Sequence, residues 1–204
     1  MGFCKGSATL SRYRVMEEPE AGLTVDFVRE RLVANAFMDI EDTSEESSVG
    51  WVELMNHLSG GFSEETFHFG EIHAFNLRQD ERRLSGKILG RYVGLWEAKF
   101  AAQTGRKPNA PKRREMKETI RLDLLRRSLL DTKLMEVLWL AEANEVWLGA
   151  AGEKNRAVFE DLWSRTFGLG LKLLVPVAVG LELLSDAKRK QLLNLDGRPF
   201  FEGE

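Results

Sequence analysis

The stretch GRKPNAPKRREMK, residues 105–117, gathers six Lys and Arg side chains around two prolines, with a single acid among them. Residues 85–102 before it have the spacing of an amphipathic helix, and Gly105 is placed to end that helix. A second helix is expected to begin near Pro111, since proline fits the first turn, and to extend to about Leu130. The side of the first helix expected to pack on the second carries Ile88, Tyr92, Leu95, Trp96 and Phe100. The stretch therefore predicts the tip of a projecting antiparallel helical hairpin.

The charge of the chain is unevenly distributed around this hairpin. Residues 78–133 hold 16 Lys and Arg against 7 Asp and Glu, a net charge of +9, whereas the whole chain carries −3 and the remainder −12. An ion-paired helix pair would interleave more acids than this segment does. The asymmetry favours a surface that faces a polyanion, and the alternative is a protruding helix pair that is merely solvated by its charges.

Composition indicates a folded protein rather than a disordered one. The 204 residues are 43% hydrophobic and 30% charged, which suits one large domain or one domain with a subdomain. No apolar run reaches the roughly 18 residues that a membrane span requires, and the first residues show no secretory h-region. The single cysteine, Cys4, cannot form an internal disulfide, so a reducing cytoplasm is expected.

Hydrophobic periodicity predicts the α+β class, with a mixed or antiparallel sheet packed with helices in addition to the projecting basic hairpin. In the helix expected at 23–37, Thr24 is the predicted N-cap, and Val28 and Leu32 belong to the apolar stripe. Residues 171–179, LKLLVPVAV, have the continuous apolar character of a buried strand. The other expected elements are strands at 7–15, 49–55 and 67–78, a β-hairpin at 133–152, and helices at 153–168 and 186–195.

These elements divide into one domain and an insertion. Residues 1–84 are expected to form the N-terminal α/β part, and residues 85–133 the projecting basic hairpin. Residues 134–195 are expected to complete the α/β domain, and residues 196–204 to be a tail.

Cations recur at helical spacing along the second predicted helix. Arg113, Lys117 and Arg121 are four residues apart and share one face, while Glu118 is placed to balance Arg114 in part. Such side chains bind phosphates without reading sequence, so non-specific duplex binding is expected. The expected phosphate contacts are, first, Arg113, Arg114, Lys117, Arg121, Arg126 and Arg127, and second, Arg106, Lys107, Lys112, Lys87 and Arg91. Three further cations, outside this set of contacts, add positive charge at the approach to the hairpin: Arg78, Arg82 and Arg83.

The order of several motifs resembles the bacterial recombination-associated protein RdgC family. CKGSATLSRYRV (4–15) precedes an amphipathic helix that ends in VANAF (33–37), and VGWVEL (49–54) follows. The resemblance continues through the basic helix pair, LLRRSL (124–129), the VLWL…EVWL hairpin and LKLLVPVAV. It covers about residues 3–179.

The resemblance implies a DNA-binding protein that is not an enzyme and needs no cofactor or metal. Proteins of this family form a ring-shaped homodimer whose basic inner face surrounds double-stranded DNA with little sequence preference. Through that binding they restrain RecA-promoted recombination and strand exchange. The implied location is the bacterial cytoplasm, at the nucleoid.

The chain departs from the family pattern in two places. Typical members are longer and their C-terminal part helps to close the ring, so an open clamp or a partner-assisted dimer is an alternative to the closed ring here. Where the family tends to read LLPRAF, this chain reads LLRRSL. Arg126 replaces the proline and adds a charge, Arg127 retains the arginine, and Leu129 replaces an aromatic residue that would pack better on a duplex.

Two other functions are consistent with the residues. The basic hairpin could dock an acidic protein partner, or loop carboxylates could serve a metal-dependent nuclease, although they show no ligand pattern. His68 and His73 are expected to face opposite sides of one strand, which argues against a metal site, and Cys4 has no paired histidine. The five tryptophans are expected in the core or at a dimer interface, with stacking on single-stranded bases as the alternative.

Overall fold

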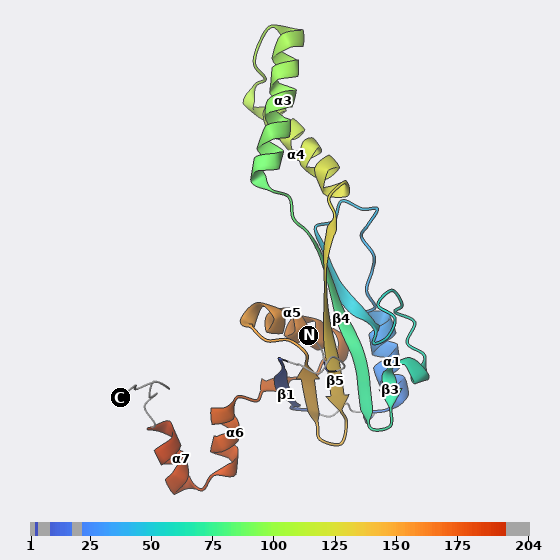
Figure 1. The fold of residues 1–204 in the computed structure, drawn as a ribbon, viewed down its shortest axis with the longest axis vertical. Coiled ribbons are helices and arrows are strands. Elements are labelled where there is room, and N and C mark those ends of the chain that lie inside the picture. Colours follow the sequence, from blue (N-terminus) through green and yellow to red (C-terminus); the bar gives the residue numbers. More distant parts are fainter. Residues whose placement is uncertain (1–2, 4–8, 18–21, 195–204) are drawn as a thin grey trace, which may run out of the picture.

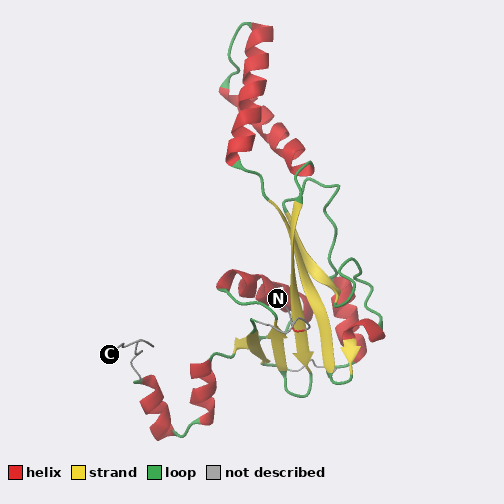
Figure 2. Ribbon diagram, viewed as in Figure 1, coloured by secondary structure: helices red, strands yellow, loops and turns green. Residues whose placement is uncertain are grey.

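The computed structural model describes residues 3, 9–17 and 22–194. These residues include an antiparallel sheet of seven strands, helices on one of its faces and a projecting helical hairpin (Figures 1 and 2). The predicted α+β class, antiparallel sheet and helical hairpin are therefore confirmed. Cys4 and the predicted tail at 196–204 lie outside the described residues.

Seven strands make up the sheet: β1 (Ser11–Val15), β2 (Ser47–Glu53), β3 (His68–Phe69), β4 (Ile72–Arg82), β5 (Leu130–Leu140), β6 (Glu145–Leu148) and β7 (Leu171–Leu173). Their order is β2-β4-β5-β6-β1-β7, with β3 paired to β4 outside this path. The predicted β-hairpin is confirmed as β5 and β6, joined by a turn at 141–144. In the strand predicted at 7–15, residues 7 and 8 lie outside the described part of the chain.

Seven helices occur among the described residues: α1 (Val25–Ala34), α2 (Glu64–Phe67), α3 (Gly86–Thr104), α4 (Ala110–Arg126), α5 (Glu153–Phe167), α6 (Pro176–Leu183) and α7 (Asp186–Leu193). Thr24 is the N-cap of α1, as predicted, and its Oγ1 accepts the Phe27 N–H at 3.1 Å. The short helix α2 lies in a segment for which the sequence predicts a loop.

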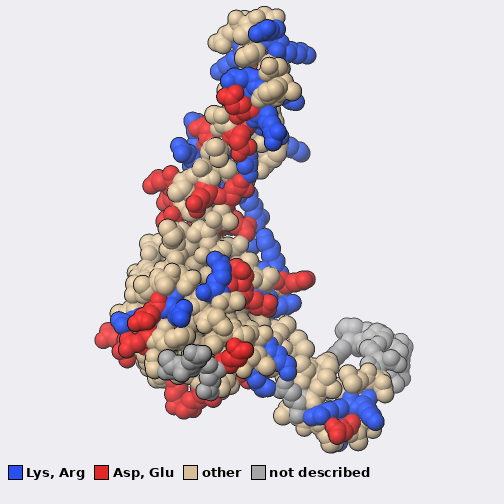
Figure 3. Space-filling view, turned by 180° about the vertical axis from the view of Figure 1, so that it is seen from behind, with Lys and Arg blue, Asp and Glu red and all other residues tan. Residues whose placement is uncertain are grey.

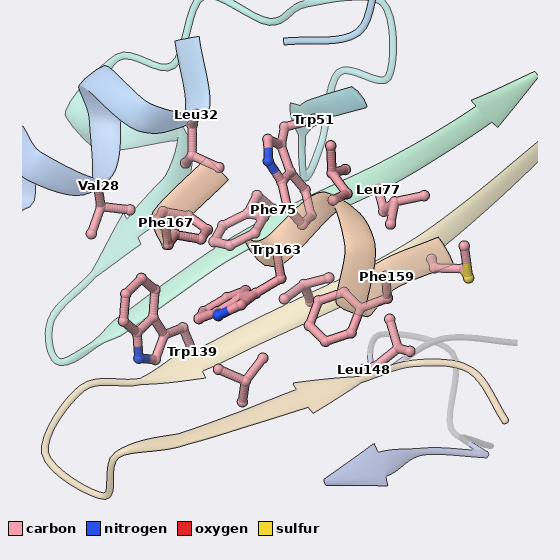
Figure 4. Packing of buried hydrophobic residues seen from close by; sticks show 14 of the residues in the cluster. Val28, Leu32, Trp51, Phe75, Leu77, Trp139, Leu148, Phe159, Trp163 and Phe167 are labelled. Atoms are coloured by element: carbon pink, nitrogen blue, oxygen red, sulfur yellow. The ribbon is translucent and has the colours of Figure 1, made fainter. Parts of the chain in front are cut away.

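The core lies between one face of the sheet and helices α1 and α5 (Figure 4). Trp139 of β5 meets Trp163 of α5 edge to face, with ring centroids 4.7 Å apart. Trp51 of β2 donates through Nε1 to Thr166 Oγ1 at 2.7 Å, which ties the sheet to α5. The predicted core location is confirmed for these three tryptophans, which are fully buried. The remaining two are half-buried: Trp96 and Trp147.

The glycine of the GWV motif is required by a crossing of two chain segments. The Phe37 N–H donates to the Trp51 carbonyl at 2.9 Å, so the segment after α1 runs against β2. A Cβ on Gly50 would lie 2.4 Å from Phe37 Cα, closer than any side chain can approach backbone. Only glycine fits at this position.

The single strand predicted at 67–78 is wrong. Gly70 has φ of 66° and turns the chain, so that β3 and β4 form a hairpin. Polar and apolar side chains alternate both before and after the turn, so the alternation typical of a strand did not reveal the turn. The glycine was the available signal, and the turn places His68 opposite His73.

The buried strand predicted at 171–179 is also wrong. Only its first three residues pair with β1, and Pro176 begins α6. Proline lacks an N–H and suits the first turn of a helix, so it ends the strand. Helices α6 and α7 pack on each other and extend away from the sheet, with Val177 and Leu183 exposed (Figure 1).

The helical hairpin α3–α4 is inserted between the paired strands β4 and β5. These strands are paired from Ile72 opposite Leu140 to Arg82 opposite Leu130, so both connections to the hairpin leave one end of the sheet (Figure 1). With 19 residues, α3 is about 28 Å long, which sets the reach of the projection.

Candidate nucleic-acid interface

The tip of the hairpin is built as the sequence predicts. Gly105 ends α3 in the left-handed conformation, with φ of 71°, and its N–H donates to the last turn at 2.9 Å. The Asn109 side chain accepts the Lys112 N–H at 3.1 Å and caps α4. Pro111 lies in the first turn of α4. The connection is therefore short and its cations, Arg106 and Lys107, are exposed.

The two helices meet through a different face of α3 from the predicted one. Val93 is only 6% exposed, whereas Ile88, Tyr92 and Leu95 are between 46% and 51% exposed. The latter three lie at helical spacing on one face, so they form an apolar stripe on the outside of the hairpin rather than its contact. Trp96 and Phe100 are half-buried, with ring centroids 5.4 Å apart.

A buried arginine fastens the foot of the hairpin. Arg82, the last residue of β4, donates through Nη1 to the carbonyls of Leu125 and Ser128, at 2.8 and 2.6 Å. Its Nη2 donates to the carbonyls of Ile40 and Glu41, at 2.7 and 2.5 Å. The last carbonyls of a helix lack intrahelical donors, and a cation there also complements the helix dipole. Arg82 therefore orients the hairpin, and both of its Nη groups donate to carbonyls within the protein.

The other two arginines of the approach have acidic side chains as partners instead. Arg78 forms two hydrogen bonds with the fully buried carboxylate of Asp80, at 3.1 and 2.7 Å, and lies over the Phe37 ring. These bonds raise the pKa of Arg78 above its ordinary value. Arg83 is exposed but lies 3.4 Å from Glu81.

Four of the eleven predicted phosphate contacts have acidic neighbours in the hairpin or at its foot. Arg113 pairs with Glu97, Arg121 with Glu46 and Glu118, Arg127 with Asp123, and Lys112 with Glu115. The expected partial balance of Arg114 by Glu118 is wrong, because Glu118 pairs with Arg121 at 3.0 Å. Exposed pairs of this kind contribute about 0–1 kcal/mol to stability, but each keeps a carboxylate beside the cation.

The other seven predicted contacts have no side-chain hydrogen bond or ion pair with any described residue. All seven are exposed, and they come from both helices and from the tip. They are Lys87, Arg91, Arg106, Lys107, Arg114, Lys117 and Arg126. Figure 3 shows a row of Lys and Arg along one edge of the projecting hairpin, whereas Asp and Glu gather on the other edge near its foot. The hairpin thus presents an unbalanced positive surface.

Between the helices lies an open groove that the sequence did not predict. Its volume is about 550 Å³, and Gly86, Gly90 and Gly94 of α3 line it opposite Arg114 and Lys117 of α4. Toward the tip a second hollow of about 450 Å³ continues it, beside Lys107. The four-residue spacing of the glycines was the signal that could have indicated an open helix face.

Comparison with protein families finds a match that includes the hairpin. The model of the family described as "Putative exonuclease, RdgC" matches residues 9–175, which is most of the 204-residue chain. The chain belongs to the RdgC family. The resemblance inferred from the order of the motifs is therefore confirmed. No curated protein matches the chain.

Membership of the RdgC family indicates a DNA-binding function related to recombination, at the level of the family. The family description also names an exonuclease activity. Among the described residues, no three His, Cys, Asp or Glu side chains lie close enough together to hold a metal ion. No helix in the described part of the chain is both long and apolar enough to cross a membrane.

His68 and His73 lie together rather than on opposite sides of a strand, so that prediction is wrong. Their Nδ1 atoms are 3.3 Å apart across the β3–β4 pair. Burial against Phe67 and Trp139, and then the neighbouring His68, lower the pKa of His73 to about 4. At neutral pH His73 is therefore uncharged and packed at the edge of the core.

Proposed function

We propose that this RdgC-family chain binds double-stranded DNA without sequence preference through the α3–α4 hairpin, and that it does so without catalytic chemistry. By occupying DNA as a dimeric clamp or ring, it restrains RecA-type strand exchange at the bacterial nucleoid. The observation that carries the proposal is the set of seven exposed cations on a projecting hairpin that have no acidic partner in the described part of the chain.

Paired and unpaired cations differ in how strongly they attract a phosphate. A Lys or Arg that neutralises a phosphate releases counterions to the solution, which favours binding. A cation with a carboxylate beside it is already partly neutralised, so an unpaired cation binds the phosphate more strongly. Arg114 and Lys117 lie one turn apart on α4, and Arg126 lies near its foot, so unpaired charges extend along the helix. Phosphate contacts fix position but carry no sequence information, which supports non-specific binding.

The dimeric form is supported by apolar surface that the monomer leaves exposed. Ile88, Tyr92 and Leu95 form the apolar stripe on the outside of α3, and Leu183 of α6 is 80% exposed. Apolar patches of this kind on a charged protein are typical of protein interfaces.

A salt titration of binding to a random-sequence duplex tests the proposal, with and without Mg²⁺. The double variant Arg114→Ala/Lys117→Ala removes two unpaired cations, and Lys112→Ala/Arg127→Ala removes two paired ones. The net charge changes equally, so the second variant is a matched control for bulk electrostatics. We expect the log–log slope to become shallower by about two units in the first variant and by less than one in the control.

Three results would contradict the proposal. Equal slopes in the two variants would mean that the unpaired cations do not bind phosphate. Binding of an acidic protein that duplex DNA cannot displace would favour the protein-docking function instead. Shortening of the duplex in Mg²⁺ would favour the nuclease function.

A further inference from the structure

The floor of the groove in the hairpin includes three glycines of α3, beside Leu89 and Val93. Gly86, Gly90 and Gly94 follow one another at four-residue intervals, which places them on one side of α3. A methyl group added to any of the three would meet no heavy atom within 4 Å, apart from the adjoining residues and the backbone of its own helix. Nothing else in the described protein packs against these glycines, although glycine weakens a helix relative to alanine. The small size of these glycines is therefore not needed for a packing contact within the described hairpin.

The wall of the groove is positively charged. Arg114 and Lys117 line it and have no acidic partner among the described residues. Arg113 also lines it and pairs with Glu97 on the facing helix. Since that pair is exposed, a phosphate that entered the groove would compete with the Glu97 carboxylate for the Arg113 guanidinium.

We propose that this groove holds one phosphodiester strand of the duplex, with its phosphates against Arg114 and Lys117 and its sugars against the glycine floor. The inference rests on the proposed function and adds the place and the orientation of the contact. A helix of a second copy would also fit a floor of small residues. However, the cations of the groove wall, Arg114 and Lys117, favour a polyanion as the occupant.

Filling the floor without changing the charge tests this inference. Gly90→Leu places a side chain in the groove, and Gly90→Ala places a single methyl group there. Both substitutions raise helix propensity, so the hairpin should keep its fold, which circular dichroism would check. Ala102→Leu is the matched control, because Ala102 is exposed on the same helix outside the groove.

We expect Gly90→Leu to weaken binding to a random-sequence duplex about tenfold and to flatten the salt slope by about two units, since the phosphates of Arg114 and Lys117 are displaced. Gly90→Ala should have a smaller effect, and Ala102→Leu should bind as the wild type does. Unchanged binding by Gly90→Leu would show that the groove does not hold the DNA strand, while leaving the proposed function intact. Failure of the wild type to bind would overturn both.

Sedimentation of the same variants distinguishes a DNA strand in the groove from a helix of a second copy. If Gly90→Leu alters the oligomeric state but not DNA affinity per assembled particle, the groove is an interface between copies and the inference is wrong. An unchanged oligomeric state together with weakened binding supports the phosphodiester strand.

Discussion

Arg82 Nη1 lies 2.8 Å from the Leu125 carbonyl oxygen, so the last residue of β4 is bonded directly to the last turn of α4. The same guanidinium reaches the loop before β2 through the carbonyls of Ile40 and Glu41. One buried side chain therefore joins the sheet, that loop and the hairpin. The direction in which the hairpin projects depends on it.

Arg82→Ala should lower the free energy of unfolding by about 3 kcal/mol, because four carbonyls lose a charged donor and a cavity remains. Urea unfolding followed by circular dichroism measures this loss. Arg83→Ala, at the exposed neighbouring position, is the control and should stay within about 0.5 kcal/mol of the wild type. Similar losses for both variants would mean that the buried contacts of Arg82 contribute little.

Gly50→Ala should destabilise the protein by about 3 kcal/mol, since the new Cβ would collide with the backbone of Phe37 and neither segment can move freely. Thermal unfolding of the variant measures the loss. Gly170→Ala provides the comparison, because a Cβ there meets only the Met16 side chain at 3.6 Å, an ordinary contact. If Gly50→Ala were as stable as Gly170→Ala, the close crossing at the GWV motif would be refuted.

The buried histidine makes stability depend on pH. The pKa of His73 is about 4 in the folded protein and about 6.5 when unfolded, so the unfolded state binds more protons between these values. The stabilisation is complete above pH 6.5 and is lost as the pH falls toward 4, by about 2 kcal/mol at pH 5. Unfolding of the wild type at pH 7.5 and pH 5 should show this loss.

In His73→Gln the loss of stability between pH 7.5 and pH 5 should be smaller than in the wild type by the same amount. His57→Gln leaves the His68–His73 pair in place and should keep the wild-type dependence. A His73→Gln profile parallel to that of the wild type would show that other groups account for the pH dependence.

Leu129 is 92% exposed where the chain leaves α4, three residues after Arg126. If this position packs on the duplex, Leu129→Phe should tighten binding about fivefold, because an aromatic ring stacks on a base better than an aliphatic chain does. Leu129→Ala should weaken binding, and fluorescence anisotropy measures both. Equal affinities for the three side chains would show that position 129 does not touch DNA.

Much of the hairpin and of the core could be predicted because the signals were local. The start of α4 at Pro111, the Gly105 termination and the turn of the β5–β6 hairpin depend on residues a few positions apart. The errors were local too, since Gly70 and Pro176 both interrupt runs whose hydrophobic pattern continues through them. In each case backbone conformation prevailed over side-chain period.

The sequence by itself determined the α+β class, the charged hairpin and the family, because these follow from local patterns and from the order of motifs along the chain. Only the tertiary structure decided which cations are free to bind a phosphate. Arg121 meets Glu46 from a distant loop, and Arg82 is buried among four carbonyls. The reason is that the strand order and the crossing of the helices bring together charges that are far apart in the chain, and no period or spacing records those distances.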